Sequence, residues 1–384
     1  MAKEGFEPTW GKPFWHNSGV NTSSANPQAD LAYQKSILGS VSRTFALTIP
    51  LLPASLEKVV GNAYLLCRIV DTIEDASNLE PSTKQALSQL FLDSVVGKVT
   101  PQAFAEPCLS VLKNHSNLSE LDLIEHIPAV LRILHTCTTQ DQEAVTKCVS
   151  IMSLGMSRFH TRQSTAGLSD LKEFEEYCYV VAGVVGELLT NLFSNHSAHF
   201  AQSMQGNESL SIGFGQALQM TNILKDSSED RARGVSWRPS KMSQSDLLTI
   251  AYNKLLEARN YILLIPKQDV GIRRFCFLAF GLAVLTLNAI ARKDSAKVIP
   301  EQKLTRRVVW TVYGFTKLAA QSNLLIKLFF YLSSQDLRKL LKLRVLTKRL
   351  RDVTAKFWSR GRNQASPLSY SHQVLGRSLL DGKA

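Results

Sequence analysis

The stretch Val-Asp-Thr-Ile-Glu-Asp-Ala, residues 70–76, closes a largely apolar segment that begins near Leu56. Within it Asp71 and Asp75 are four residues apart, so on a helix both carboxylates lie on one face, one turn apart. Two neighbouring acids repel each other, and burying them without a partner costs several kcal/mol. We therefore expect them to share a divalent cation, and carboxylate oxygens suit Mg²⁺. Glu74 adds a third oxygen ligand.

A second acidic stretch, Asn-Ile-Leu-Lys-Asp-Ser-Ser-Glu-Asp at residues 222–230, repeats this spacing. One such pair alone is commonly a solvated helix face. Two copies, far apart in the sequence and each at the end of an apolar helix, instead indicate two helices that face each other across a pocket. Each helix would hold Mg²⁺ against a shared phosphate-bearing ligand. The predicted metal ligands are Asp71, Glu74, Asp75, Asn222, Asp226, Glu229 and Asp230.

The remainder of the sequence predicts an all-α protein. Hydrophobic periodicity is helical along nearly the whole chain, without convincing alternating strands or hairpin turns. With 384 residues, 45% of them hydrophobic, the chain is long enough to bury a large core. The most hydrophobic stretch, residues 272–291, is expected to be a buried core helix because it is slightly short for a membrane span. Six scattered cysteines without a Cys-x-x-Cys pair indicate reduced core residues and a cytoplasmic location.

The positive charge of the chain is concentrated at its C-terminal end. From residue 303 onward there are 17 Lys/Arg and 3 Asp/Glu, whereas the formal charge of the whole chain is +12. No helix-turn-helix, zinc or RNA-binding signature accompanies this basic segment, so nucleic acid is not the expected partner. Between residues 317 and 360, apolar residues alternate with Lys and Arg as in amphipathic basic helices. These helices are expected either to bind a membrane surface peripherally or to pack on the catalytic core.

We expect three parts: a polar N-terminal arm (1–29), a catalytic domain (30–315), and basic amphipathic helices with a disordered tail (316–384). Residues 77–139 are expected to form less regular helices and loops without assigned chemistry.

Residues 171–193 are expected to form one helix, capped by Ser169 or Asp170. Gly183 and Gly186 interrupt its apolar run, which indicates either close helix packing or space for a bulky lipid chain.

Five segments of the sequence, in order and spacing, resemble the squalene/phytoene synthases, which join two prenyl diphosphates head to head. The resemblance covers about residues 30–310, and its segments are Ser42-Arg-Thr-Phe45, Tyr64-Leu-Leu-Cys-Arg68, Asp71-Thr-Ile-Glu-Asp75, Tyr177-Cys-Tyr-Val-Val-Ala-Gly183 and Gln219-Met-Thr-Asn-Ile-Leu-Lys-Asp-Ser-Ser-Glu-Asp230. It implies a single all-α isoprenoid-synthase domain with a central cavity.

The resemblance also implies roles for individual residues. The catalytic set would be Tyr177, beside the reacting centre, with Asp71, Asp75, Asp226 and Asp230, which with Glu74 would hold Mg²⁺ on the diphosphates. The substrate would be bound by Ser42, Arg43, Phe45, Tyr64, Arg68, Val181, Ala182, Gly186, Gln219 and Asn222. NADPH and diphosphate oxygens would be contacted by Arg43, Arg68, Lys225, Lys303 and Arg306.

The residues around 181–193 and 274–280 look closer to squalene synthases than to phytoene synthases. The resemblance therefore implies condensation of two farnesyl diphosphates through presqualene diphosphate to squalene, with Mg²⁺ and NADPH. The alternatives are dehydrosqualene, presqualene diphosphate or phytoene as the product, without the reductive step. A further alternative is a non-enzymatic assembly factor, although relatives of that kind have lost the acidic motifs that are present here.

Overall fold

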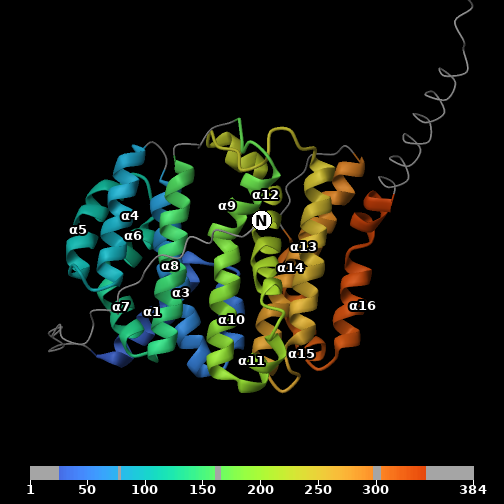
Figure 1. Ribbon diagram of the computed structural model, residues 1–384, viewed down its shortest axis with the longest axis horizontal. Helices are drawn as coiled ribbons and strands as arrows, with labels where there is room; N and C mark the ends of the chain where they lie inside the picture. Colours follow the sequence, from blue (N-terminus) through green and yellow to red (C-terminus); the bar gives the residue numbers. More distant parts are fainter. Residues whose placement is uncertain (1–25, 77–78, 161–165, 297–303, 343–384) are drawn as a thin grey trace, which may run out of the picture. The chain divides into compact units, whose positions relative to one another are not determined.

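A computed structural model of the protein describes residues 26–76, 79–160, 166–296 and 304–342. Every regular element in this part of the chain is a helix, and one isolated backbone bridge joins Leu168 to Pro239, so the predicted all-α fold is confirmed (Figure 1). The elements are α1 (Pro27–Val41), α2 (Phe45–Thr48), η2 (Ile49–Leu51), α3 (Ala54–Asp75), α4 (Pro81–Val95), α5 (Pro101–Leu112), α6 (Leu118–Glu125), α7 (Ile127–His135), α8 (Thr139–His160), α9 (Leu171–Cys178), η3 (Tyr179–Gly183), α10 (Val184–His196), α11 (Ala198–Met204), α12 (Ser209–Ala232), α13 (Gln244–Leu264), α14 (Val270–Ala296), α15 (Arg306–Ala319) and α16 (Asn323–Ser333).

The two acidic stretches lie at the C-terminal ends of two long helices, α3 and α12. Helix α3 starts directly after Pro53, where the fixed proline φ suits a helix start, and it is buried along most of its length. Helices α8, α10, α12 and α13 contact one another in this order and run side by side in Figure 1, with α3 behind α8 and α10. The tertiary structure thus brings α3 and α12, which are far apart in the sequence, to the same cavity.

The helix expected over residues 171–193 is interrupted. It consists of α9, one turn of π-helix (Tyr179–Gly183) and α10, and the Asp170 side chain caps its start by accepting from the Glu173 N–H at 2.9 Å. Single π turns are often found at functional sites because they shift the register of the following side chains. Periodicity alone did not reveal this interruption.

Glycines allow this interrupted helix to lie very close to α12. A Cβ on Gly186 would lie 2.0 Å from the Ser211 carbonyl oxygen, and a Cβ on Gly215 would lie 1.9 Å from that of Ala182. Neither distance is tolerable for a side chain against a backbone atom, so close packing accounts for these glycines. Gly186 also lines the cavity, so this residue lies both at the contact between the two helices and on the cavity wall.

Residues 77–139, expected to form less regular helices and loops, contain helices that are more regular than expected. The described residues in this range form four helices, α4 to α7, with Phe91 and Phe104 fully buried between α4 and α5. Prolines stand in the first turns of α4, α5 and α7, where the missing N–H is not needed.

Helix α14 is the buried core helix expected from its composition. Two segments, Leu171–His196 and Val270–Arg292, are long and apolar enough to cross a membrane, but 56% and 72% of their most apolar windows are buried inside the protein. Burial of this kind is usual for core helices of globular proteins.

The fully buried Arg273 on α14 links this helix to the C-terminal part of the fold. Its guanidinium donates to the Ala320 carbonyl at 2.6 Å and to Asn323 Oδ1 at 2.7 Å, and also to two carbonyls at the end of α13. Helices α15 and α16 therefore belong to the first of two compact units, which ends at Leu337.

The domain boundary expected at residues 315/316 falls inside this first unit, because α14 binds the turn between α15 and α16. Up to residue 337 the structure thus has the basic helices packed on the body. The second unit comprises residues 338–384, of which 338–342 are described. The arm expected over residues 1–29, apart from 26–29, and the disordered tail expected within 316–384, from 343 onward, lie outside the described residues.

Candidate active site

A cavity of about 960 Å³ lies between α3, α10, α12 and α14. Its walls include both acidic stretches and every site residue predicted from the sequence, except Lys303 and Arg306. Lys303 lies outside the described residues, and Arg306 is an exposed residue at the start of α15. The fold therefore brings together, on one cavity, the acids that were predicted from their helical spacing. The structure does not show that the basic residues 303 and 306 reach this cavity.

The cavity is charged at one end and apolar along the rest. On α3 the lining runs from Val60 to Asp75, and the 11 steps along the helix from Val60 to Asp71 correspond to about 16 Å. The same order holds on α12, where Phe214 is apolar and Asp226 is acidic. The apolar wall is completed by Ile49, Met152, Met156, Leu188, Leu189, Ile223, Phe275 and Ala279. This shape suits an amphiphile with an anionic head and a long hydrocarbon tail.

The acids at the charged end resist ionisation. Burial, together with the neighbouring Asp75, raises the pKa of Asp71 to about 7. Burial also raises the pKa of Asp75 and of Asp226. Asp75 is surrounded by protein, so it is largely desolvated. Its side chain nevertheless faces the cavity, so a ligand in the cavity can reach it. A cation bound here would relieve the repulsion between these groups.

Several cations face the same acids. Arg68 on α3 is paired with Glu120 on α6, Arg233 donates to Asp230 Oδ1 at 2.5 Å, and Lys225 lies 3.2 Å from Asp226. Guanidinium groups bind phosphate oxygens through paired, charge-assisted hydrogen bonds. Arg43 is exposed at the cavity lining beside Ser42.

Sequence reasoning missed Glu120 and Arg233. Glu120 lies in the segment to which no chemistry was assigned, 52 residues from Arg68, and no local pattern connects the two. Arg233 could have been found, because it is a cation immediately after the second acidic stretch.

Tyr177 is held by aromatic rings on two sides. Its ring stacks on Trp237 with centroids 4.1 Å apart and meets Phe159 edge-on at 5.1 Å. Burial raises its pKa well above the usual value, so the hydroxyl stays protonated at neutral pH. Trp237 was also missed by sequence reasoning, because it follows the end of α12 in a segment without periodicity.

The donor set fits Mg²⁺. Asp71, Glu74, Asp75, Asp226, Glu229 and Asp230 offer carboxylate oxygens and Asn222 offers an amide oxygen, all on one cavity. These are the hard oxygen ligands that Mg²⁺ takes, commonly shared with substrate phosphates. The pKa values of Asp71, Asp75 and Asp226 are raised, and a bound divalent cation would lower them because it favours the ionised carboxylates.

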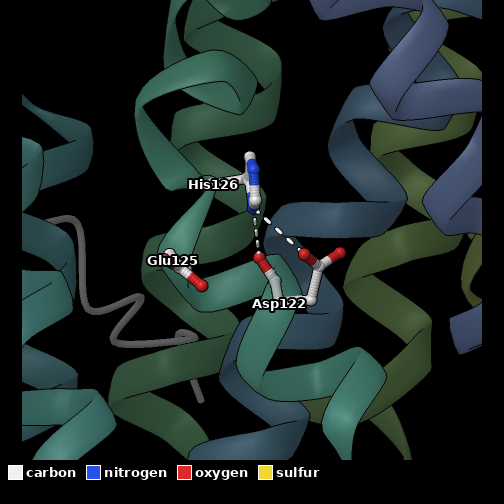
Figure 2. A group of neighbouring side chains, drawn as sticks. All are labelled: Asp122, Glu125 and His126. Carbon is white, nitrogen blue, oxygen red and sulfur yellow. Dashed lines mark hydrogen bonds and ion pairs between the residues drawn. The ribbon is translucent and has the colours of Figure 1, made fainter.

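A second acidic cluster lies outside the cavity lining. Figure 2 shows Asp122, Glu125 and His126 at the C-terminal end of α6, with potential ligand atoms within 4.8 Å of one another. His126 Nδ1 donates to the Asp122 carbonyl at 2.9 Å, and the Tyr33 hydroxyl donates to Asp122 Oδ2 at 3.2 Å. These bonds hold Asp122 and His126 in place at the end of α6.

Comparison with known proteins agrees with this geometry. The profile of the squalene/phytoene synthase family matches residues 38–249. The chain is 28% identical over 302 residues to squalene synthase clz20 of Cochliobolus lunatus, covering 71% of this chain and 69% of that protein. It is 31% identical over 202 residues to squalene synthase BSS of Botryococcus braunii, covering 52% of this chain but only 41% of that relative.

Solved structures show the same fold. The chain superimposes on a TcSQS complex with a TM-score of 0.65 at 21% identity, covering 83% of this chain and 97% of the other. A dehydrosqualene synthase gives a TM-score of 0.54 at 22% identity, covering 76% and 96%. The family match spans more than half of the chain and includes both acidic stretches on α3 and α12. The chain therefore belongs to the squalene/phytoene synthase family.

Proposed function

We propose that this protein condenses two molecules of farnesyl diphosphate head to head, through presqualene diphosphate, to squalene, with Mg²⁺ and NADPH. One observation carries the proposal: two acidic stretches from α3 and α12 meet at one end of a cavity of about 960 Å³ whose other walls are apolar. Squalene synthases are prominent among the family members that resemble this chain. Members of this family act on prenyl diphosphates, and the cavity has the polarity such substrates require.

The charged end of the cavity binds the diphosphates. Arg43, Arg68 and Lys225 neutralise and orient the phosphate oxygens, and Ser42 provides a hydroxyl beside Arg43. The acidic residues on α3 and α12 would hold Mg²⁺, which when bound neutralises the charge of the departing diphosphate. The Tyr177 hydroxyl remains protonated, so it can donate a hydrogen bond to an oxygen of the leaving group.

The remaining walls protect the allylic cation that is left when diphosphate departs. Phe45, Tyr64, Tyr177 and Trp237 place aromatic rings on the cavity, and ring faces stabilise positive charge. Met and Leu side chains along α8 and α10 exclude water that would otherwise quench the cation. The second prenyl chain then provides the electron pair that forms the new carbon–carbon bond.

The reductive step distinguishes squalene from the other products. NADPH, if bound, would supply the hydride that reduces the last cation, and we propose that Arg43, Arg68, Lys225, Lys303 and Arg306 would hold its phosphates. Without that hydride, loss of a proton would yield dehydrosqualene, or phytoene from longer chains. Since every acid of both motifs is present on the cavity, an assembly factor without catalysis is the less favoured function.

The product lipids formed by the purified protein test this proposal. The protein is incubated with farnesyl diphosphate and Mg²⁺, with and without NADPH, and the extracted lipids are identified. We expect squalene only with NADPH, and presqualene diphosphate or dehydrogenated and hydroxylated C30 products without it. A hydrocarbon formed in unchanged yield without NADPH would place the protein among the dehydrosqualene or phytoene synthases.

Substitution of the acids tests the site itself. Asp71→Asn and Asp226→Asn should each lower diphosphate release by about 100-fold or more, because each removes a charge that holds the cation. The helical circular dichroism should be unchanged, and Glu143→Gln, an exposed acid on α8, serves as the matched control. Turnover near that of the unsubstituted protein in either Asn variant would contradict the mechanism.

A further inference from the structure

Helix α4 places a buried lysine, Lys84, beside the acidic end of α3. The side chain of Lys84 is 2% exposed, and no other lysine in the described part of the chain is buried to this extent. Its Nζ donates a hydrogen bond to the main-chain carbonyl oxygen of Glu74, in the last turn of α3. Burying an ammonium group is costly unless acceptors or opposite charges compensate it, so this placement needs a physical reason.

The end of α3 is an unfavourable place for acids. The last carbonyl groups of a helix have no partners within the helix and carry partial negative charge. The three acids of the first acidic stretch lie at this end, and the last turn of α3 contains no basic residue. Helix α12 differs, because Arg231 lies in its last turn and Arg233 donates to Asp230. Helix α3 therefore lacks a cation that α12 supplies from its own sequence.

Lys84 supplies this cation from a neighbouring helix that packs against α3. Its bond to the Glu74 carbonyl satisfies one of the carbonyl groups at the helix end, where a lysine also interacts favourably with the helix dipole. Burial lowers the pKa of Lys84, whereas the carboxylates of Glu74 and Asp75 act against this shift and favour the charged ammonium. One ammonium group thus compensates both the helix end and the acids that it carries.

Other roles explain Lys84 less well. It is not among the residues that line the cavity, so direct contact with the substrate does not account for it. Packing does not account for it either, because an apolar side chain of similar length would fill the same space without burying a charge.

We infer that Lys84 is a positioning residue that acts as a fixed counter-charge behind the metal ligands. It stabilises the acidic end of α3 without metal, and it thereby weakens the affinity of this end for Mg²⁺, since a fixed cation repels the bound one. The inference rests on the proposed function, because it concerns the Mg²⁺ site formed by α3 and α12.

Thermal unfolding of the full-length protein over a series of Mg²⁺ concentrations, without substrate, tests this role. Lys84→Met removes the charge and nearly keeps the length of the side chain. At about pH 8 we expect its midpoint without Mg²⁺ to fall by about 5 °C or more, because buried carboxylates lose their counter-charge. Saturating Mg²⁺ should restore most of this loss. The Mg²⁺ concentration that gives half of the rise in Tm should be about tenfold lower than in the unsubstituted protein. A loss of stability that Mg²⁺ does not restore would overturn the inference, because a lysine that only filled the core would behave in this way.

A double variant tests the charge pairing directly. Glu74→Gln with Lys84→Met removes one acid together with its counter-charge, so fewer buried carboxylates remain uncompensated. Its midpoint without Mg²⁺ should lie above that of Lys84→Met alone, and it should fold even if Lys84→Met does not. A double variant that is no more stable than Lys84→Met, or that fails to fold, would contradict the role of counter-charge.

Lys98→Met is the matched control. Lys98 follows the end of α4, has a 69% exposed side chain and pairs with Asp93 at 3.3 Å. An exposed pair contributes little to stability, so this variant should keep both the midpoint and the Mg²⁺ dependence of the unsubstituted protein. If Lys84→Met responded to Mg²⁺ as this control does, Lys84 would not set the affinity of the site.

The unsubstituted protein separates this inference from the proposed function. If Mg²⁺ raises its Tm but the Lys84 variants respond in the same way, only the role of Lys84 fails. If Mg²⁺ does not raise its Tm, the proposed metal site fails, and the role of Lys84 fails with it.

Discussion

At the scale of single residues, Glu120 has a role that its sequence position does not suggest. Its Oε1 pairs with Arg68, and its Oε2 accepts from the Asn117 N–H at 3.1 Å, as part of the capping box of α6. Arg68 also lies one turn before Asp71, which would attract the guanidinium if Glu120 did not hold it. We infer that Glu120 positions Arg68 for the substrate diphosphate.

Glu120→Gln tests this positioning. Glutamine keeps the capping box but removes the negative charge, so α6 should remain folded while Arg68 becomes free to pair with Asp71. We expect the KM for farnesyl diphosphate to rise about tenfold, which equals about 1.4 kcal/mol, with a smaller change in kcat. Asn117→Ala is the control: it removes the cap at a cost of about 1 kcal/mol of stability and should leave KM unchanged. An unaltered KM in the Gln variant would show that Arg68 is positioned by other groups.

The pKa of Asp71 predicts a pH dependence for metal binding. Because its folded-state pKa is raised from 3.8 to about 7, the folded protein binds more protons than the unfolded chain between these values. The contribution of this group to stability is therefore fully present below pH 3.8 and is lost as the pH rises through about 7. Mg²⁺ must displace this proton, so its apparent affinity should fall toward about tenfold per pH unit below pH 7.

Thermal unfolding with and without Mg²⁺ measures that dependence. The rise in Tm caused by Mg²⁺ should be much larger at about pH 8 than at about pH 6. In Asp71→Asn the carboxyl group is absent, so the remaining effect of Mg²⁺ should depend less on pH. A pH-independent effect in the unsubstituted protein would show that Asp71 is already ionised without metal.

At the scale of secondary structure, the π turn and the glycines of α10 and α12 determine how closely two walls of the cavity approach. Gly186→Ala would place a Cβ 2.0 Å from the Ser211 carbonyl oxygen, so α10 and α12 would have to separate. We expect a loss of stability at the upper end of the roughly 1–3 kcal/mol that overpacking costs, with reduced turnover. Chemical denaturation and steady-state kinetics measure both effects.

Gly39→Ala on α1 is the matched control. A Cβ at Gly39 meets nothing within 4 Å, so this substitution should stabilise the protein by about 0.5–1 kcal/mol through helix propensity alone. If Gly186→Ala behaved like the control, close packing would not explain the glycine.

At the scale of the whole molecule, the C-terminal helices are part of the folding unit. Arg273 is fully buried and bonds Ala320 at the end of α15 and Asn323 at the start of α16. A chain that ends at Tyr313 would leave this charge without two of its acceptors, and a buried unpaired charge costs several kcal/mol. We expect such a chain to unfold or aggregate.

A chain that ends at Leu337 keeps the whole first unit and should fold with nearly the full thermal midpoint. Circular dichroism melts of both truncations check the prediction. A stable, active chain ending at Tyr313 would show that the catalytic body does not depend on α15 and α16.

The sequence by itself determined the helical class and the acids of the candidate site. Both follow from local spacing: apolar residues recur with the helical period, and Asp71/Asp75 and Asp226/Asp230 share a helix face because they are four residues apart. That both acidic helix ends meet on one cavity is a result of the tertiary structure, because position along each helix leaves the relative direction of the two helices open.

Only the tertiary structure decided which distant residues join them. Glu120 meets Arg68 across 52 residues, and Trp237 meets Tyr177 from the segment after α12. The same holds for α15 and α16, whose basic composition suits a membrane or a protein core equally well. The buried Arg273 shows that one side of these helices packs on the rest of the protein. A buried charge requires hydrogen-bond acceptors, and Ala320 and Asn323 provide two of them.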